Sequence, residues 1–211
     1  MNGYHARETA VKKEPKLVVQ SAEGEDPVSP EPTRLQRQLE RSQDENIADL
    51  PQACDWGTKK DSKGKKLTWR GYKLHLDVAD GDLPVSWLVT SASLHDSQAA
   101  IPLAQMSAER VISLYDLADA AYDADPIRQM SARLGHVAII DHNPRRGEKK
   151  EFSPAQAIRY RQRSSAERVH SHLHDNHGGR HVRVRGAVKV AAHLSFGLLV
   201  IAAEQLLTML C

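Results

Sequence analysis

The sequence predicts a mixed α/β fold, in which helices cover a sheet with both antiparallel and parallel strands. Residues 68–92 carry the pattern of an antiparallel hairpin. Two short apolar runs, 111–117 and 137–141, then alternate with helical segments, as strands do in layered α/β domains. A long polar helix over 153–175 follows. Together these observations indicate a mixed sheet flanked by helices.

Alternation of apolar and polar residues identifies the hairpin. From Tyr72 to Val78 every second residue is apolar, which is the period of a half-buried strand. The dipeptide Asp80-Gly81 favours a tight turn, and residues 83–92 return as the partner strand. We predict that the strands at 68–78, 83–92 and 111–117 are neighbours in one sheet.

The segment after the hairpin predicts helices that alternate with buried strands. Asp96 suits the cap of a helix over residues 94–106, and Asp125-Pro126 suits the start of another that ends near residue 134. Asp119 directly follows the apolar run 111–117. Ligand sites in open α/β sheets lie at the carboxyl ends of strands, so Asp119 is a candidate site residue. The alternative is a common turn or helix-capping Asp.

The long helix carries an unusual polar face. Ser153 as N-cap, Pro154 at the first helical position and Gln156 three residues after the cap predict its start. One face of this helix then presents Tyr160, Arg163, Glu167, His170 and His174. A separate, narrower stripe is apolar and consists of Ile158, Ala166, Val169 and Leu173. A solvated salt bridge is the alternative reading of Glu167 among arginines.

The two ends of the chain differ in composition. Residues 1–50 are predicted to be a flexible charged segment with one surface helix over residues 33–49, and residues 51–66 a basic loop. The run 189–210 predicts a closing core helix rather than a membrane span, because His193 and Glu204 interrupt it. The two cysteines show no disulfide or metal spacing, and the N-terminus has no apolar signal region, so we expect a cytoplasmic protein.

Three stretches resemble the DDE transposases of bacterial insertion sequences over roughly residues 51–210. They are GYKLHLDVADGDLPVSWLVTSASLHDSQ, LYDLADAAYDA and YRQRSSAERVHSHLHD. The last contains the family pattern of Tyr, two residues, Arg, three residues and Glu, as Tyr160, Arg163 and Glu167. After six more residues the pattern has Lys or Arg, and His174 stands at that position. A protonated His still donates to phosphate, although more weakly.

The resemblance implies an RNase H-like catalytic domain over residues 51–211 that acts in DNA transposition. It makes Asp119 and Glu167 catalytic ligands of Mg²⁺ or Mn²⁺, for phosphodiester cleavage and strand transfer at insertion-sequence ends. It assigns Tyr160, Arg163 and His174 to DNA binding. The expected partners are double-stranded DNA at transposon ends and target, and further copies of the chain in the active homo-oligomer. No membrane is expected, and the resemblance implies a bacterial, nucleoid-associated protein.

The third acidic residue of the family has no clear counterpart. In the family it lies on the first strand of the sheet, and residues 4–8 resemble the segment that follows this strand, so the Asp is expected just before Met1. Asp55 is the internal candidate. We therefore expect a domain missing its first strand, and a catalytically inactive DNA-binding or oligomerisation remnant is the alternative function.

Two further interpretations concern basic and imidazole side chains. Non-specific duplex binding is predicted through Lys59, Lys60, Lys63, Lys65, Lys66, Arg180, Arg183 and Arg185. A zinc module would use His170, His172, His174 and His177, of which His170 and His174 have a true ligand spacing. An RNase H-like nuclease unrelated to transposition would share the acids but not the spacing of Tyr160, Arg163 and Glu167.

Overall fold

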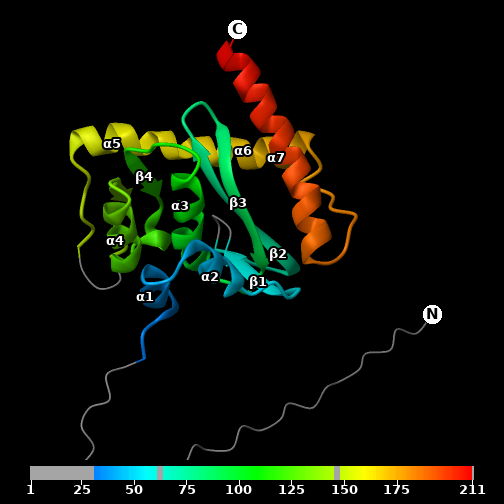
Figure 1. Ribbon diagram of the computed structural model, residues 1–211, viewed down its shortest axis with the longest axis horizontal. Coiled ribbons are helices and arrows are strands. Elements are labelled where there is room, and N and C mark those ends of the chain that lie inside the picture. Colours follow the sequence, from blue (N-terminus) through cyan, green and yellow to red (C-terminus); the bar gives the residue numbers. More distant parts are fainter. Residues whose placement is uncertain (1–30, 61–63, 145–147, 211) are drawn as a thin grey trace, which may run out of the picture. The chain divides into compact units, whose positions relative to one another are not determined.

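The structure is a computed structural model that describes residues 31–60, 64–144 and 148–210 (Figure 1). Its compact unit begins at Pro32. It therefore includes residues that the sequence places in the charged N-terminal segment. The part of that segment expected to be flexible, residues 1–30, lies outside the described residues.

Two short helices open the compact unit, where the sequence predicts one surface helix. α1 (Arg34–Leu39) and α2 (Gln43–Ala48) each begin with a capping box. Gln38 and Asn46 are both fully buried, and the Asn46 side-chain amide donates to the Gln38 carbonyl oxygen at 2.9 Å. Because buried polar groups need such partners, these helices are tied to each other and to the packed fold.

Three antiparallel strands form the first sheet. β2 (Lys66–Ala79) and β3 (Leu83–Ser91) make the predicted hairpin, and Gly81 in its turn has a φ of 77°. β1 (Asp55–Lys60) pairs with the first part of β2, in a segment predicted to be a basic loop. That prediction is wrong because backbone pairing with β2, which the polar side chains do not reveal, determines the conformation here.

A second sheet contains one parallel pair. β4 (Tyr115–Ala118) and β5 (Val137–Ile140) pair with each other, and no other described strand pairs with either. The prediction that the run 111–117 neighbours the hairpin strands is therefore wrong. Ile112 and Leu114 are 99% and 68% exposed. The strand begins only at Tyr115, where β5 first supplies a hydrogen-bonding partner.

Helices fill the connections much as predicted. After β3 come η1 (Asp96–Ala99) and α3 (Ala100–Ala108), and between β4 and β5 come η2 (Ala120–Tyr122) and α4 (Asp125–Arg133). The backbone of the predicted cap Asp96 belongs to η1, and His95 takes the capping position through its ring nitrogen.

The long polar helix is interrupted by one tight turn. It consists of α5 (Pro154–Tyr160), the 3₁₀ turn η3 (Arg161–Arg163) and α6 (Ser164–Asn176). Backbone angles through the turn stay in the right-handed helical region, so the segments continue as one rod (Figure 1). Ser153 forms the predicted capping box, whereas Ile158 of the predicted apolar stripe is 66% exposed.

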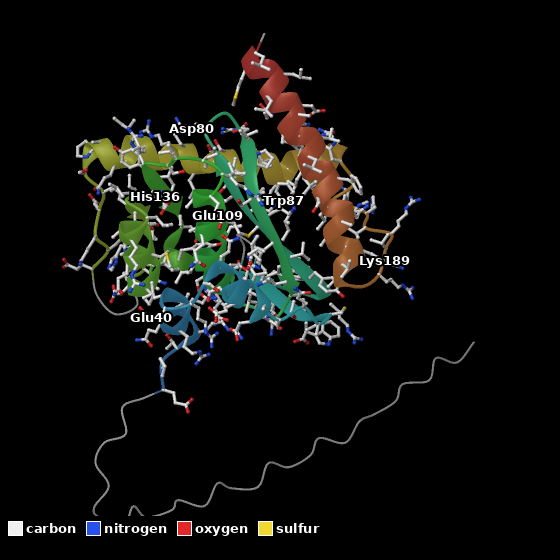
Figure 2. All side chains as sticks on the ribbon, in the orientation of Figure 1. Glu40, Asp80, Trp87, Glu109, His136 and Lys189 are labelled. Carbon is white, nitrogen blue, oxygen red and sulfur yellow. The ribbon has the colours of Figure 1, made fainter. Side chains whose placement is uncertain are left out.

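The largest core cluster joins α6 and α7 (Ala187–Leu210) to the hairpin. Trp87 of β3 lies against α7, where its indole nitrogen donates to Ser195 Oγ at 2.8 Å (Figure 2). The buried members of the cluster are Val169, Leu173, Val190, Leu194, Leu198 and Ile201, and apolar residues of β2 and β3 pack against them.

Only one face of α7 is in the core. Its opposite face exposes large apolar side chains, including Phe196 at 71% and Leu207 at 63%. The predicted core helix is therefore correct for the face on the hairpin and wrong for the other, because a sheet covers a helix from one side. By length and composition α7 could also cross a membrane, and 28% of its apolar window is buried.

Candidate functional site

Asp119 lies at the carboxyl end of β4, as predicted. It caps η2, and its Oδ1 accepts a hydrogen bond from the Ala121 backbone N–H at 2.9 Å. The side chain is exposed, and its second oxygen receives no hydrogen bond from the described residues. Asp119 thus fulfils the capping role that was its alternative interpretation, while one carboxylate oxygen stays available to a ligand.

The helix that carries the other candidate residues packs against this strand. η3 contacts β4, and the Arg159 guanidinium lies 3.8 Å from the centre of the Tyr115 ring on β4. A cation over an aromatic face is attracted by the ring's negative charge density. This contact and that of η3 hold the helix against β4, the strand that Asp119 follows.

Arg163 bonds to Glu167, one of the two candidate carboxylates, and feels the charge of the other, Asp119. Its Nη2 donates to Glu167 Oε1 at 2.7 Å, one helical turn away. Partial burial would lower the pKa of Arg163, but the hydrogen bond to Glu167 and the charges of Glu167 and Asp119 raise it. Arg163 therefore stays positively charged, within the electrostatic reach of both acids.

Tyr160 belongs to the same group of residues. The Arg163 guanidinium lies 5.7 Å from the centre of its ring, and Phe152 packs on the ring at a centroid distance of 4.8 Å. Burial raises the pKa of the Tyr160 hydroxyl, Arg163 opposes the rise, and the charges of Asp141 and Asp119 add to it. The hydroxyl is therefore a neutral hydrogen-bond donor at physiological pH.

A further carboxylate at this edge was missed by the sequence reasoning. Asp141 directly follows β5, and its backbone N–H donates to the Ala118 carbonyl at 3.1 Å, so it lies beside the end of β4. Its carboxylate pairs with Lys149 at 3.1 Å. The signal was present, since both Asp119 and Asp141 come directly after apolar runs that form neighbouring parallel strands.

The donor set fits a hard divalent cation. Glu167 keeps Oε2 free of hydrogen bonds from the described residues, as Asp119 keeps Oδ2, and its side chain is 63% exposed. Mg²⁺ prefers carboxylate oxygens and retains several waters, so it suits open sites of one or two carboxylates. The expected separation of these two carboxylates, within about 8 Å for a hydrated ion, stays a prediction.

Two other sequence-predicted residues lie apart from this group. His174 near the end of α6 is exposed and pairs with Asp175 at 3.3 Å, which also binds Arg180 at 2.6 Å. Asp55 begins β1, is exposed, and accepts a hydrogen bond from the Trp56 backbone N–H at 2.7 Å. No contact among the described residues joins either side chain to Asp119 or Glu167.

A groove separates the two sheets. It has a volume of about 880 Å³ and is lined by residues 76–80 at the end of β2 and just beyond, and by residues 111–118 around β4, with α3 and the α5–α6 rod closing it. Among the described strands only β3 pairs with the Tyr72–Ala79 part of β2, and only β5 pairs with β4. Each sheet therefore presents an unpaired edge to this inter-sheet groove.

Acidic side chains line the inter-sheet groove. Burial raises the pKa of Asp77 on β2, the hydrogen bond from Ser107 Oγ opposes the rise, and the charge of Asp116 adds to it. On β4, Asp116 accepts a hydrogen bond from His136 Nδ1 at 3.0 Å, while its Oδ2 is buried without a hydrogen-bond partner among the described residues. A buried oxygen without a hydrogen-bond donor costs folding free energy, so the described residues leave one acceptor in this groove unpaired.

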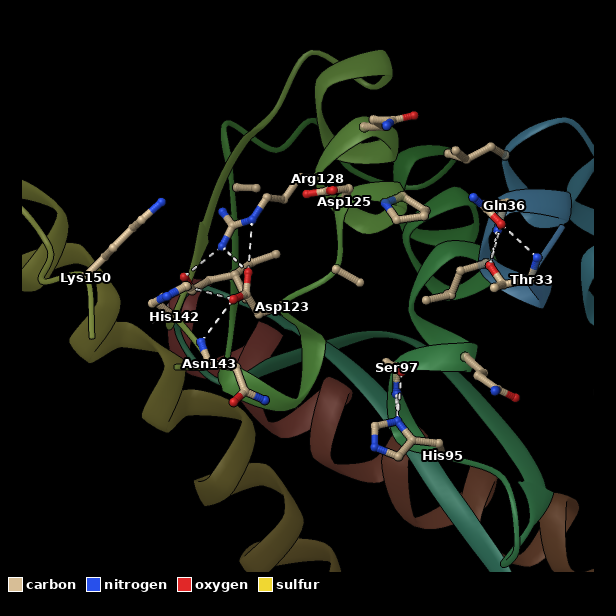
Figure 3. Close-up of a pocket in the computed structure, with 18 of the residues that line it drawn as sticks. Thr33, Gln36, His95, Ser97, Asp123, Asp125, Arg128, His142, Asn143 and Lys150 are labelled. Carbon is tan, nitrogen blue, oxygen red and sulfur yellow. Dashed lines mark hydrogen bonds and ion pairs between the residues drawn. The ribbon is translucent and has the colours of Figure 1, made fainter. Parts of the chain in front are cut away.

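A separate pocket of about 1640 Å³ is lined by Asp123 among other polar residues (Figure 3). Both carboxylate oxygens of Asp123 accept hydrogen bonds, from Arg128 at 2.7 Å, His142 at 3.1 Å and the Asn143 backbone N–H at 2.9 Å. Burial would raise the pKa of Asp123, but these donors outweigh it and lower the pKa. Asp123 thus holds the segment after β5 in place by hydrogen bonds, and both of its oxygens are already engaged.

The basic side chains predicted to bind DNA are largely on the surface. Lys59, Lys65, Lys66, Arg180, Arg183 and Arg185 are exposed. The Lys60 side chain and Lys63 lie outside the part that the structure describes. The described members come from two regions, β1 with the start of β2 and the connection between α6 and α7.

The comparisons with known proteins give one match. The family model described as the transposase DDE domain matches residues 38–202. No curated protein and no solved structure matches the chain. The matched range begins within α1 and ends within α7, and it includes Asp119, Tyr160, Arg163, Glu167 and His174.

Proposed function

The chain belongs to the transposase DDE domain family, and on that premise we propose that Asp119 and Glu167 hold divalent metal for phosphodiester cleavage and strand transfer at transposon ends. Transposition is the function of this family, DNA is its substrate, and divalent metal ions are its usual cofactors. The observed mixed α/β fold, with helices flanking the sheets, is consistent with an RNase H-like domain. We propose three further points, namely Asp119 and Glu167 as the metal ligands, Mg²⁺ or Mn²⁺ as the metal, and cleavage and strand transfer at insertion-sequence ends.

Arg163 is the observation that carries this proposal. The Arg163 guanidinium is bonded to Glu167 at 2.7 Å, and η3, which carries Arg163, contacts β4, the strand that Asp119 follows 48 residues before Glu167 in sequence. A solvated i,i+4 pair would bring Glu167 and Arg163 together without Asp119. The contact between η3 and β4 therefore favours a shared site over a surface salt bridge.

Each side chain then has a distinct task. Divalent ions, when bound, activate the attacking oxygen and stabilise the leaving oxygen of an in-line displacement. Asp119 and Glu167 offer the free carboxylate oxygens for such ions. Arg163 fixes the rotamer of Glu167 and offers its remaining N–H groups to a DNA phosphate. Tyr160 donates its neutral hydroxyl to the same backbone.

The inter-sheet groove has room for the expected first strand. Strands in a sheet lie about 4.8 Å apart, so one extended segment between two unpaired edges would join them into a single sheet. We infer that a segment bearing the third carboxylate occupies this groove in the active protein. The buried, partnerless oxygen of Asp116 supports an occupant that donates hydrogen bonds.

A nicking assay on supercoiled plasmid with Mg²⁺ or Mn²⁺ tests the proposal. We expect no cleavage by this chain alone, and cleavage when an N-terminal extension supplies an extended strand ending in Asp. Asp119→Asn and Glu167→Gln should each abolish that cleavage, whereas Asp44→Asn, which changes an exposed carboxylate on α2, should not. Cleavage that survives both substitutions would overturn the assignment of the two residues.

The catalytically inactive DNA-binding or oligomerisation remnant is the second candidate. Two surfaces favour this candidate, because both suit association with other chains. They are the unpaired strand edges at the inter-sheet groove and the exposed apolar face of α7. Retained duplex binding whose affinity falls steeply between about 50 and 200 mM salt, with no cleavage by the extended chain, would support this function. A flat salt dependence would contradict DNA binding by either candidate and leave only the oligomerisation form of the remnant.

A further inference from the structure

The end of α6 turns a histidine back toward α7. His177 is the C-cap residue directly after α6, and Gly178 beyond it has a φ of 79°. The N–H groups of His177 and Gly179 both donate to the Leu173 carbonyl, at 3.2 and 2.9 Å, which closes the helix end. This fixed turn determines where the His177 ring can point.

Gly197 of α7 allows close approach at this point. A Cβ at position 197 would lie 2.8 Å from the His177 carbonyl oxygen and 3.1 Å from its Cβ. Glu204 follows Gly197 by seven residues and so lies on the same side of α7. The helix crossing therefore brings Glu204 to the His177 ring.

His172 completes a three-residue cluster. Its ring meets that of His177 edge to face, with centroids 4.7 Å apart. Glu204 Oε2 lies 3.5 Å from His177 Nε2 and 3.8 Å from His172 Nε2, and all three ligand atoms lie within 4.8 Å of one another. In a tetrahedral zinc site, bonds of about 2.1 Å place ligand atoms about 3.4 Å apart.

Nε2 of His177 has no hydrogen-bond partner in the part of the chain that the structure describes. This nitrogen is buried, and the side chain is only 14% exposed. The separation from Glu204 exceeds a good hydrogen bond, so the contact does not satisfy this atom. His193 is engaged elsewhere, since its Nε2 lies 3.0 Å from the Gly178 carbonyl oxygen. A buried imidazole nitrogen aimed at a carboxylate and a second imidazole is suited to a cation.

We propose that His172, His177 and Glu204 bind one divalent transition-metal ion of the zinc type, with a water as fourth ligand. Two imidazoles and a carboxylate are a known zinc donor set, and imidazole selects such ions over Mg²⁺. The site links α6 to α7 and is separate from the acid pair at Asp119 and Glu167. It replaces the four-histidine site considered from the sequence, because the described structure groups only two of those histidines and adds Glu204.

Binding of zinc by the full chain, freed of affinity tags and stripped with a chelator, tests this site. Competition with a chromogenic chelator should give one zinc ion per chain, and Co²⁺ should give the absorption of a four-coordinate ion. At a free zinc concentration of about 100 times Kd, the Tm should rise by roughly 5–10 °C. The same stoichiometry in the double variant Asp119→Asn, Glu167→Gln would separate this site from the acid pair.

Substitutions within the cluster distinguish ligands from packing residues. Glu204→Gln keeps the shape of the side chain, so it should leave the Tm in chelator unchanged while weakening zinc binding at least about tenfold. His172→Ala and His177→Ala should also remove the zinc-dependent rise in Tm. His181→Ala, an exposed histidine beyond α6, should bind zinc as the unchanged chain does. Zinc binding unaffected by Glu204→Gln, or absent from the unchanged chain, would overturn the proposal.

Discussion

Replacing His75 should remove a large part of the acid sensitivity of the fold. His75 lies on β2, is only 5% exposed, and its Nε2 is 2.8 Å from Thr90 Oγ1. Burial lowers its pKa from 6.5 to about 4, the charge of Asp96 opposes the shift, and Lys73 adds to it. The folded state therefore holds the neutral ring, whereas the unfolded chain accepts a proton near pH 6.5.

The sign and size of the effect follow from this difference. Because the folded pKa is depressed, the unfolded state binds the extra proton, so stability is lost as pH falls from 6.5 toward about 4. A shift of this size corresponds to about 3 kcal/mol of unfolding free energy. Above pH 6.5 the ring is neutral in both states and the contribution is constant.

Urea unfolding at pH 7, 5.5 and 4 would measure the effect. His75→Gln cannot take up a proton, so it should be less stable than the unchanged chain at pH 7 and lose about 3 kcal/mol less on acidification. Other groups titrate equally in both proteins, and the difference between the two pH profiles isolates residue 75. Parallel profiles would refute the assignment of this acid sensitivity to His75.

Four further substitutions, of which Leu199→Ala is a control, test the packing and the buried charge. Gly197→Ala should cost about 1–3 kcal/mol in urea unfolding, because its Cβ would lie 2.5 Å from Leu173 Cδ1, and an unchanged midpoint would contradict the close crossing of α6 and α7. Asp77→Asn should raise the Tm at neutral pH, since the raised pKa of Asp77 makes its ionisation destabilising, and this gain should vanish as pH falls toward 3.8. Leu198→Ala, at a fully buried position, should cost about 2–5 kcal/mol. Leu199→Ala, at a 53% exposed position, should cost far less, and equal losses would contradict the one-sided burial of α7.

Local patterns account for the parts of the fold that could be predicted. The hairpin of β2 and β3 follows from period-two alternation around Asp80-Gly81, and the start of α5 follows from its capping box. Both are determined by residues that are close in sequence. Asp119 was placed at a strand end for the same reason, since the apolar run and the Asp are adjacent.

Long-range pairing accounts for what could not be predicted. β1 is a strand because it pairs with β2, although its basic residues are typical of a loop. The apolar run before Asp119 does not reveal that its partner is β5 rather than the hairpin. Glu204 is 27 residues from His177 in sequence, and only the crossing of α6 and α7 brings them together.

The central claim, that Asp119 and Glu167 serve one metal site, is tested most directly by a double-mutant cycle of Mn²⁺ affinity. The chain extended at its N-terminus by a strand ending in Asp would be titrated by electron paramagnetic resonance, otherwise unchanged and as Asp119→Asn, Glu167→Gln and the double variant. If both carboxylates contact one ion, each single substitution should weaken binding at least about tenfold, and the double variant should lose clearly less than the two losses combined. An affinity unchanged by Glu167→Gln, or losses that simply add, would show that the two residues do not share a site.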